Sequence, residues 1–248
     1  GDSSYIQDPF FAGMVREAVR LGMELVWYEQ QPEQTCLPDC THRERAAERE
    51  RVQAENLANF LEQNPNARVL VHVGYGHHVE SRPYGYTYMG GHFSDITGID
   101  PLTVSQTLGT PRVNPDRRLL LQYLDEHYEI DRPSVLFDAR ANPFRISEGT
   151  DLSVIHPVVD DVCDRPTWTA MNGYRRPVPI SLESAPDQRP MVLMAFASGE
   201  PNDAIPIDQL MVESEVDEVC LMLPDGAYRL AAAVSGVEPV NLLNLDVE

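Results

Sequence analysis

The sequence predicts an α/β protein: a mainly parallel sheet flanked by helices, followed by a smaller antiparallel β module. Strand-like and helix-like segments alternate through the first 160 residues, which is typical of a parallel sheet. Residues 69–73 are almost continuously apolar, as in strands buried on both faces. After about residue 157, prolines recur between short β-type runs. We therefore expect an α/β domain over residues 1–160 and a β-rich module over residues 161–248.

The helices are predicted from capping residues and apolar periodicity. Asp8-Pro9 begins the first one, since an aspartate cap followed by proline is a common helix start, and Gly22 ends it. A long charged helix follows over residues 42–63, with Glu50 on its inner apolar stripe between Ala47 and Ala54. The remaining predictions are helices at 86–98 and 119–127, strands at 24–28, 69–73, 102–106 and 134–138, and β-type runs at 191–196 and 220–223.

Charge and composition exclude several classes of partner and chemistry. The net charge of -20 repels nucleic acid and anionic lipid. All 19 basic residues are arginine, which excludes lysine Schiff-base chemistry and the usual Gly-Lys-Ser/Thr phosphate loop. No apolar run is long enough to span a membrane, and no signal peptide is visible. We expect a small-molecule or peptide substrate, and the sequence does not predict an oligomeric state.

The four cysteines, Cys36, Cys40, Cys163 and Cys220, allow three disulfide pairings. Cys36 and Cys40 flank a short turn and could form a local disulfide, remain as free thiols, or join His42 in a zinc site. These alternatives stay open from the spacing alone. A local disulfide favours an oxidising compartment, so we expect a periplasmic or secreted protein.

Polar residues follow two of the predicted strands. Glu29 ends the first of them, and His77 and His78 follow the second after a turn with Gly74 and Gly76. In open parallel sheets, ligands bind just beyond the carboxyl ends of strands. Histidine can bind a metal or move a proton near neutral pH, and a carboxylate can act as a second ligand or a general base. We therefore predict a shared site for the side chains of Glu29 and His77.

Glu50 and His92 are further candidates. A carboxylate on the inner stripe of a helix would be buried and would need a partner, for which Arg49 or Arg45 is available. His92 follows a Gly-Gly pair and is interpreted equally well as a residue of the helix face or of the site. His72, within the apolar run, is better explained as a hydrogen-bonded core histidine.

Several of these residues fall in a recognisable pattern. It consists of Arg49-Glu50-x-x-Gln53-Ala54-x-Asn56-Leu57, the apolar run, Gly74-x-x-His77, and Met89-Gly90. The pattern resembles the superfamily of erythromycin esterase-like proteins, ChaN-like haem-binding lipoproteins and Tiki/TraB proteins, best over residues 8–110. The resemblance implies an α/β fold and a polar site in which His77, Arg49, Glu50 and Glu29 match family positions, with His77 and Glu29 as ligands of a divalent metal. The family has an earlier strand with its own histidine motif, which nothing before Glu29 supplies; we expect either a preceding segment or a member that lacks half of the site.

Three functions follow from this pattern. The first is a hydrolase, acting with or without a metal, that cleaves an ester or peptide bond with His77, Glu29, Arg49 and Glu50 as catalytic residues. The second is an extracytoplasmic protein that binds haem or a small ligand through His77 or His92, with Tyr75, Tyr86 and Met89 as walls of the pocket. The third is a non-catalytic domain of a surface assembly. We expect the hydrolase.

Overall fold

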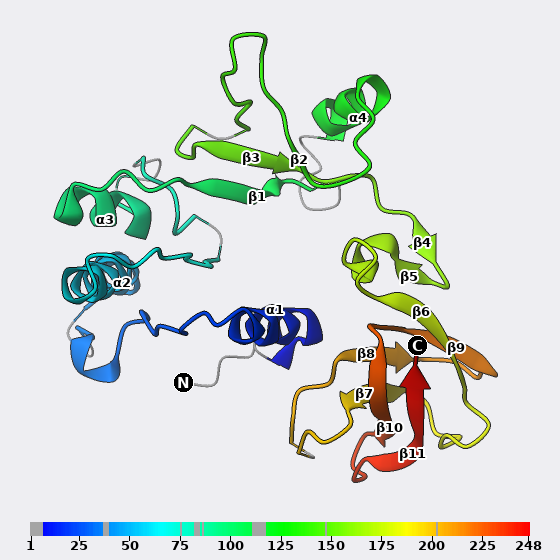
Figure 1. Cartoon of the computed structure of the whole chain (residues 1–248). Helices are drawn as coiled ribbons and strands as arrows, with labels where there is room; N and C mark the ends of the chain where they lie inside the picture. Colours follow the sequence, from blue (N-terminus) through cyan, green and yellow to red (C-terminus); the bar gives the residue numbers. More distant parts are fainter. Residues whose placement is uncertain are drawn as a thin grey trace. The chain divides into compact units, whose positions relative to one another are not determined.

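The structure is a computed structural model, and it divides into two compact units. One comprises Val26–Val158, and the other comprises the residues up to Leu25 together with Val159–Glu248 (Figure 1). The first helix of the chain therefore belongs with the β-rich C-terminal part. The described residues are 7–36, 40–74, 76–81, 85, 87–110, 118–146, 148–201 and 203–248.

The unit Val26–Val158 contains a helix pair and a small mixed sheet. Helix α2 (His42–Gln63) packs against α3 (Met89–Thr97), and Ala54, Leu57 and Met89 form the buried centre of this contact. The sheet has the order β1-β3-β2, with β1 (Val104–Gly109) parallel to β3 (Leu152–Ile155) and β2 (Ser134–Val135) antiparallel to it. Helix α4 (Arg118–His127) packs on Ile155 of β3 through Leu121 and Leu124.

Local capping explains where the helices begin and end. Thr41 caps α2 by accepting a hydrogen bond from the Glu44 N–H, and the Glu44 carboxylate accepts one from the Thr41 N–H. Gly98 ends α3 in the left-handed conformation, with φ of 69°. These bounds confirm the predicted helix over residues 42–63 and the predicted end of the shorter helix.

The predicted α/β architecture with a mainly parallel sheet is wrong. The described strands form several small, mostly antiparallel sheets, and β1 with β3 is the one parallel pair among them. Residues 24–28 and 69–73, predicted as central strands, are extended but pair with no strand among the described residues. Leu70 is 83% exposed. A run of β-forming residues favours extended backbone, but a sheet also requires a neighbouring strand to satisfy its N–H and C=O groups.

The other unit is built from antiparallel strands. Its four-stranded sheet has the order β11-β10-β7-β8, and a separate ladder joins β6 to β9. The strands are β4 (Asp161–Val162), β5 (Arg165–Pro166), β6 (Arg176–Ser181), β7 (Met191–Ala197), β8 (Asp208–Val212), β9 (Glu218–Leu223), β10 (Gly226–Val234) and β11 (Val240–Val247). Leu193, Leu221 and Leu230, all fully buried, lie in its core. Helix α1 (Pro9–Arg20), capped by Asp8 as predicted, contacts β8.

A buried ion pair and a disulfide lie in this second unit. Arg165, on β5, donates to the fully buried carboxylate of Asp208 at 2.8 Å and to the Cys220 carbonyl at 3.2 Å. Cys163 and Cys220 form a disulfide that joins the two sides of this contact.

In the unit Val26–Val158, Cys36 and Cys40 form the local disulfide, which was one alternative beside free thiols and a zinc site with His42. No helix in the described part of the chain has the length and apolar character that crossing a membrane requires.

Candidate functional site

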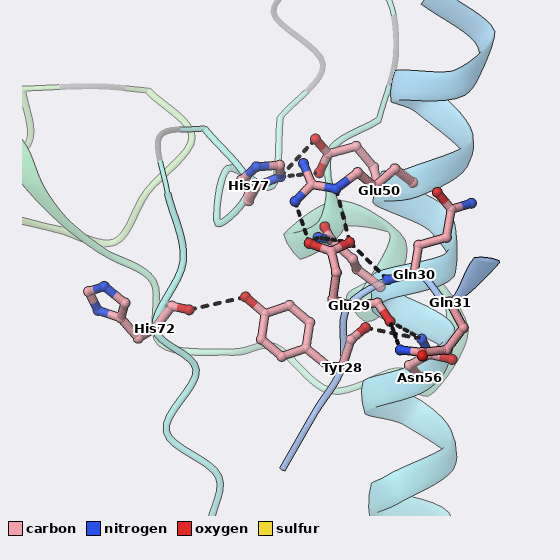
Figure 2. A network of polar contacts seen from close by, with 10 residues as sticks. Tyr28, Glu29, Gln30, Gln31, Glu50, Asn56, His72 and His77 are labelled. Carbon is pink, nitrogen blue, oxygen red and sulfur yellow. Dashed lines mark hydrogen bonds and ion pairs between the residues drawn. The ribbon is translucent and has the colours of Figure 1, made fainter. Parts of the chain in front are cut away.

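The centre of the candidate site is a contact between Glu50 of α2 and His77. Nδ1 of His77 lies 2.8 Å from Oε1 and 2.9 Å from Oε2 of Glu50 (Figure 2). The backbone N–H of Met89 donates to Oε2 of Glu50 at 2.9 Å. The Glu50 side chain is 6% exposed, and that of His77 is 21% exposed. Because a carboxylate accepts at this contact, the proton of the neutral imidazole sits on Nδ1, and the Nε2 lone pair is left for another partner.

Backbone geometry holds His77 in this position. Gly76 has φ of 69°, in the left-handed region that favours glycine, and its carbonyl accepts from the Val79 N–H at 2.8 Å in a tight turn. The His77 carbonyl accepts from the Gly90 N–H at 2.8 Å. A Cβ at Gly90 would lie 2.6 Å from the His78 carbonyl oxygen, so glycine is required for this close approach. The turn is thereby fixed to the first turn of α3.

Glu29 lies against the same stretch of α2, where its partner Arg49 is the residue before Glu50. Its carboxylate forms a bidentate ion pair with Arg49, in which Nε donates to Oε1 at 2.9 Å and Nη2 donates to Oε2. Gln53 Nε2 lies 3.0 Å from both carboxylate oxygens, and the Gln30 N–H donates to Oε1 at 2.8 Å. Burial by itself would raise the pKa of Glu29, but these hydrogen bonds and the Arg49 charge together hold it below its ordinary value.

The Glu29–Arg49 pair and the Glu50–His77 pair meet the same turn of α2, because residues 49 and 50 are adjacent on this helix. The hydrogen bonds that Arg49 donates to Glu29 raise the pKa of Arg49 most, and the negative charges of Glu29 and Glu50 raise it further. Tyr28 Oη donates to the His72 carbonyl at 3.0 Å, which ties the segment before Glu29 to the segment before His77 (Figure 2). Glu29 and His77 therefore contact adjacent residues of α2, and the segments that carry them are not strands paired in a sheet.

The partners within the site differ from those expected. Glu50 was expected to pair with Arg49 or Arg45, but its partners are His77 and the Met89 N–H. Arg49 instead pairs with Glu29, whose carboxylate also accepts from Gln53.

Two residues of the site were named from the sequence but were given no function there. Gln53 is 2% exposed and holds Glu29, although its place on the inner stripe of α2 was visible as a buried polar residue. His78 lies beside His77, and its buried Nε2 has no hydrogen-bond partner among the described residues. Burial first, and the neighbouring His77 second, lower the pKa of His78.

The other candidates lie on α3 or outside the described residues. His92 is half-buried on α3, and its charge contributes to lowering the pKa of Glu48, after the larger effect of the Arg51 hydrogen bond. Met89 is 4% exposed and packs against α2. Tyr75 and Tyr86 lie outside the described residues.

The donor set does not fit a divalent metal. Catalytic metals usually have about three protein ligands. The site offers Nε2 of His77, whereas both oxygens of Glu29 accept from Arg49 and Gln53, and Glu50 holds Nδ1 of His77. No group of three or more His, Cys, Asp or Glu side chains in the described part of the chain has an arrangement that could hold a metal ion.

No protein-family model, curated protein or solved structure matches this chain.

Proposed function

We propose that the chain hydrolyses an ester or peptide bond with His77 as the general base. The observation that carries this proposal is the contact of His77 Nδ1 with the buried carboxylate of Glu50. A carboxylate that holds one ring nitrogen fixes the tautomer and the orientation of the imidazole and stabilises the imidazolium that forms during catalysis. No described residue is bonded to Nε2, so this atom is available to a water molecule or a substrate.

In the proposed reaction, Nε2 of His77 takes a proton from a water molecule while the water oxygen bonds to the carbonyl carbon of the substrate. The carbonyl oxygen gains the negative charge of the tetrahedral intermediate. When the intermediate collapses, the bond to the alkoxide or amine breaks, and the imidazolium returns its proton to that leaving group. Glu50 keeps its hydrogen bond to Nδ1 throughout.

Arg49 is suited to stabilise the negative charge on the substrate oxygen. Glu29 occupies Nε and Nη2 of its guanidinium, which leaves the two N–H groups of Nη1 with no partner among the described residues. Positioned donors aimed at a developing oxyanion are a large source of rate enhancement. Glu29 and Gln53 then act as positioning residues that hold the guanidinium in place.

Two further observations support this proposal. The residues involved, Glu29, Arg49, Glu50 and His77, are those that match the erythromycin esterase-like pattern in the sequence. Two disulfides also favour an oxidising compartment, and we propose a periplasmic or secreted location. Hydrolysis in such a compartment would act on external esters or peptides.

The test is hydrolysis of p-nitrophenyl butyrate and of fluorescently labelled casein by the full chain. His77→Asn should lower kcat/KM by about 10²–10⁴-fold, which is the usual contribution of general acid–base catalysis. His127→Asn is a matched control, because this exposed imidazole bonds only the Tyr123 carbonyl of its own helix α4. Turnover by His77→Asn equal to that of the parent, or no turnover by the parent with either probe, would show that the proposal is wrong.

Haem binding is the competing proposal, because an imidazole with a carboxylate on Nδ1 and an open Nε2 also suits an axial ligand. The buried position of Met89 gives no support to its expected place in a pocket wall. A Soret band that develops on adding haemin and disappears in His77→Asn, without hydrolysis of either probe, would favour this alternative.

A further inference from the structure

A second feature of the unit Val26–Val158 is an open hollow of about 560 Å³ between the segment after Val26 and the C-terminal half of α2. Most of its polar lining consists of side-chain amides rather than charged groups. These are Gln31, Gln34, Asn56, Asn59 and Gln63. An amide offers a donor and an acceptor in one plane, and can therefore bind neighbouring hydroxyl groups, each of which both donates and accepts.

Some of these amides are held in place by hydrogen bonds to one another and to the backbone. Gln34 Nε2 donates to Asn56 Oδ1 at 2.9 Å, and Gln34 Oε1 accepts from the Gln31 N–H at 2.8 Å. Asn56 Nδ2 donates to the Tyr28 carbonyl at 3.0 Å, and Gln31 Nε2 donates to the Glu29 carbonyl at 2.9 Å (Figure 2). This network orders one side of the hollow before any ligand arrives, which lowers the entropic cost of binding.

Two aromatic rings complete the lining. Trp27 is 66% exposed, and Phe60 is half-buried on α2. An exposed indole is costly to leave in water and offers a flat apolar face beside the polar amides. The C–H face of a sugar ring has the complementary character, with apolar hydrogens on its face and hydroxyls around its edge.

Few ionisable groups line this hollow. Glu33 is the one ionisable residue among the nine that line it, whereas 23% of the residues of the whole chain are charged. An anionic ligand would be repelled by the surrounding field, and a cation would find one carboxylate. A neutral ligand that is rich in hydroxyl groups fits both the amides and the charge.

We propose that this hollow binds a neutral saccharide, with one sugar ring stacked on Trp27 and its hydroxyls bonded to Asn59, Gln63 and the ordered amides. This inference depends on the hollow alone and not on the proposed hydrolase activity. The two features adjoin at Glu29, whose carbonyl accepts from Gln31 while its carboxylate holds Arg49.

The test uses Trp27 as the reporter. In the full chain with Trp168→Phe, Trp27 is the remaining tryptophan, and its fluorescence is titrated with cellotetraose, maltotetraose and chitotetraose. At least one of these should give a saturable change with a Kd of about 1 mM or tighter. Asn59→Ala should weaken binding about fivefold to tenfold, the usual effect of losing one or two hydrogen bonds. Gln122→Ala, on the exposed face of α4, should leave the Kd unchanged.

The outcomes separate this proposal from the proposed activity. His77→Asn should bind the saccharide with the parental Kd, so loss of hydrolysis and loss of saccharide binding are independent results. No saturable response to any of the three oligosaccharides would overturn the proposal. A saturable response to an extended tetra-alanine peptide alone would assign the hollow to peptides instead, and an equal response in Trp27→Phe would place the binding elsewhere.

Discussion

Replacing Glu50 by alanine is expected to destabilise the unit Val26–Val158 by about 3 kcal/mol. The substitution removes the acceptor for the His77 Nδ1–H and for the Met89 N–H. Hydrogen bonds to a charged group contribute about 1.5–3 kcal/mol each. Removing a buried carboxylate also removes the free-energy cost of burying it. The net loss of stability therefore falls near the lower end of the summed contributions of the two hydrogen bonds.

Glu55→Ala on the same helix is the matched control. Glu55 forms an exposed ion pair with Arg51 one turn away, and such a pair contributes less than about 0.5 kcal/mol. Both variants lose one carboxylate from α2 and gain the same alanine, so helix propensity and net charge change equally. The difference in stability between them therefore reports the burial and the partners of Glu50.

Urea unfolding followed by far-ultraviolet circular dichroism is a suitable assay, since α2, α3 and α4 all lie in the affected unit. The unfolding midpoint of Glu50→Ala should fall with an unchanged slope against urea. If Glu50→Ala and Glu55→Ala unfold at the same urea concentration, the buried contact between Glu50 and His77 does not hold the site together.

Three further outcomes are expected. Asp208→Ala should lower the free energy of unfolding, measured with urea, by about 3–5 kcal/mol, because Arg165 is left as an unpaired buried charge. A loss below about 1 kcal/mol, the size typical of a surface ion pair, would contradict this. The pKa of Glu29 is lowered in the folded state, so the ionised carboxylate stabilises the fold above its unfolded pKa of about 4.3, and this stabilisation is lost as the pH falls through the lower folded value. Glu29→Gln should therefore lose less stability on acidification than the parent. Parallel curves of stability against pH for the two proteins would argue against the shift. Gly90→Ala should destabilise the chain by about 1–3 kcal/mol, because the new Cβ meets the His78 carbonyl, and this cost exceeds the gain from the higher helix propensity of alanine. A variant that is more stable than the parent in thermal unfolding would refute that close approach.

The sequence predicted the helices well because their signals are local. The Asp8-Pro9 cap, the Thr41 capping box and Gly98 each act through neighbouring residues, and the structure has helices that begin or end there. The sequence also predicted a shared site for Glu29 and His77, and these two residues contact the neighbouring α2 residues Arg49 and Glu50. The turn at Gly76 was predicted from the glycine itself, and in the structure this residue lies in the left-handed region.

The tertiary structure alone decided the sheets and the partners within the site. An apolar run such as residues 69–73 favours extended backbone, but strand pairing depends on which distant segment lies beside it, and here the described residues supply none. Adjacent residues on an α-helix point about 100° apart, so Arg49 and Glu50 reach different neighbours. Arg49 therefore meets Glu29, and Glu50 meets His77, since helix packing rather than sequence proximity selects the partner of a buried charge.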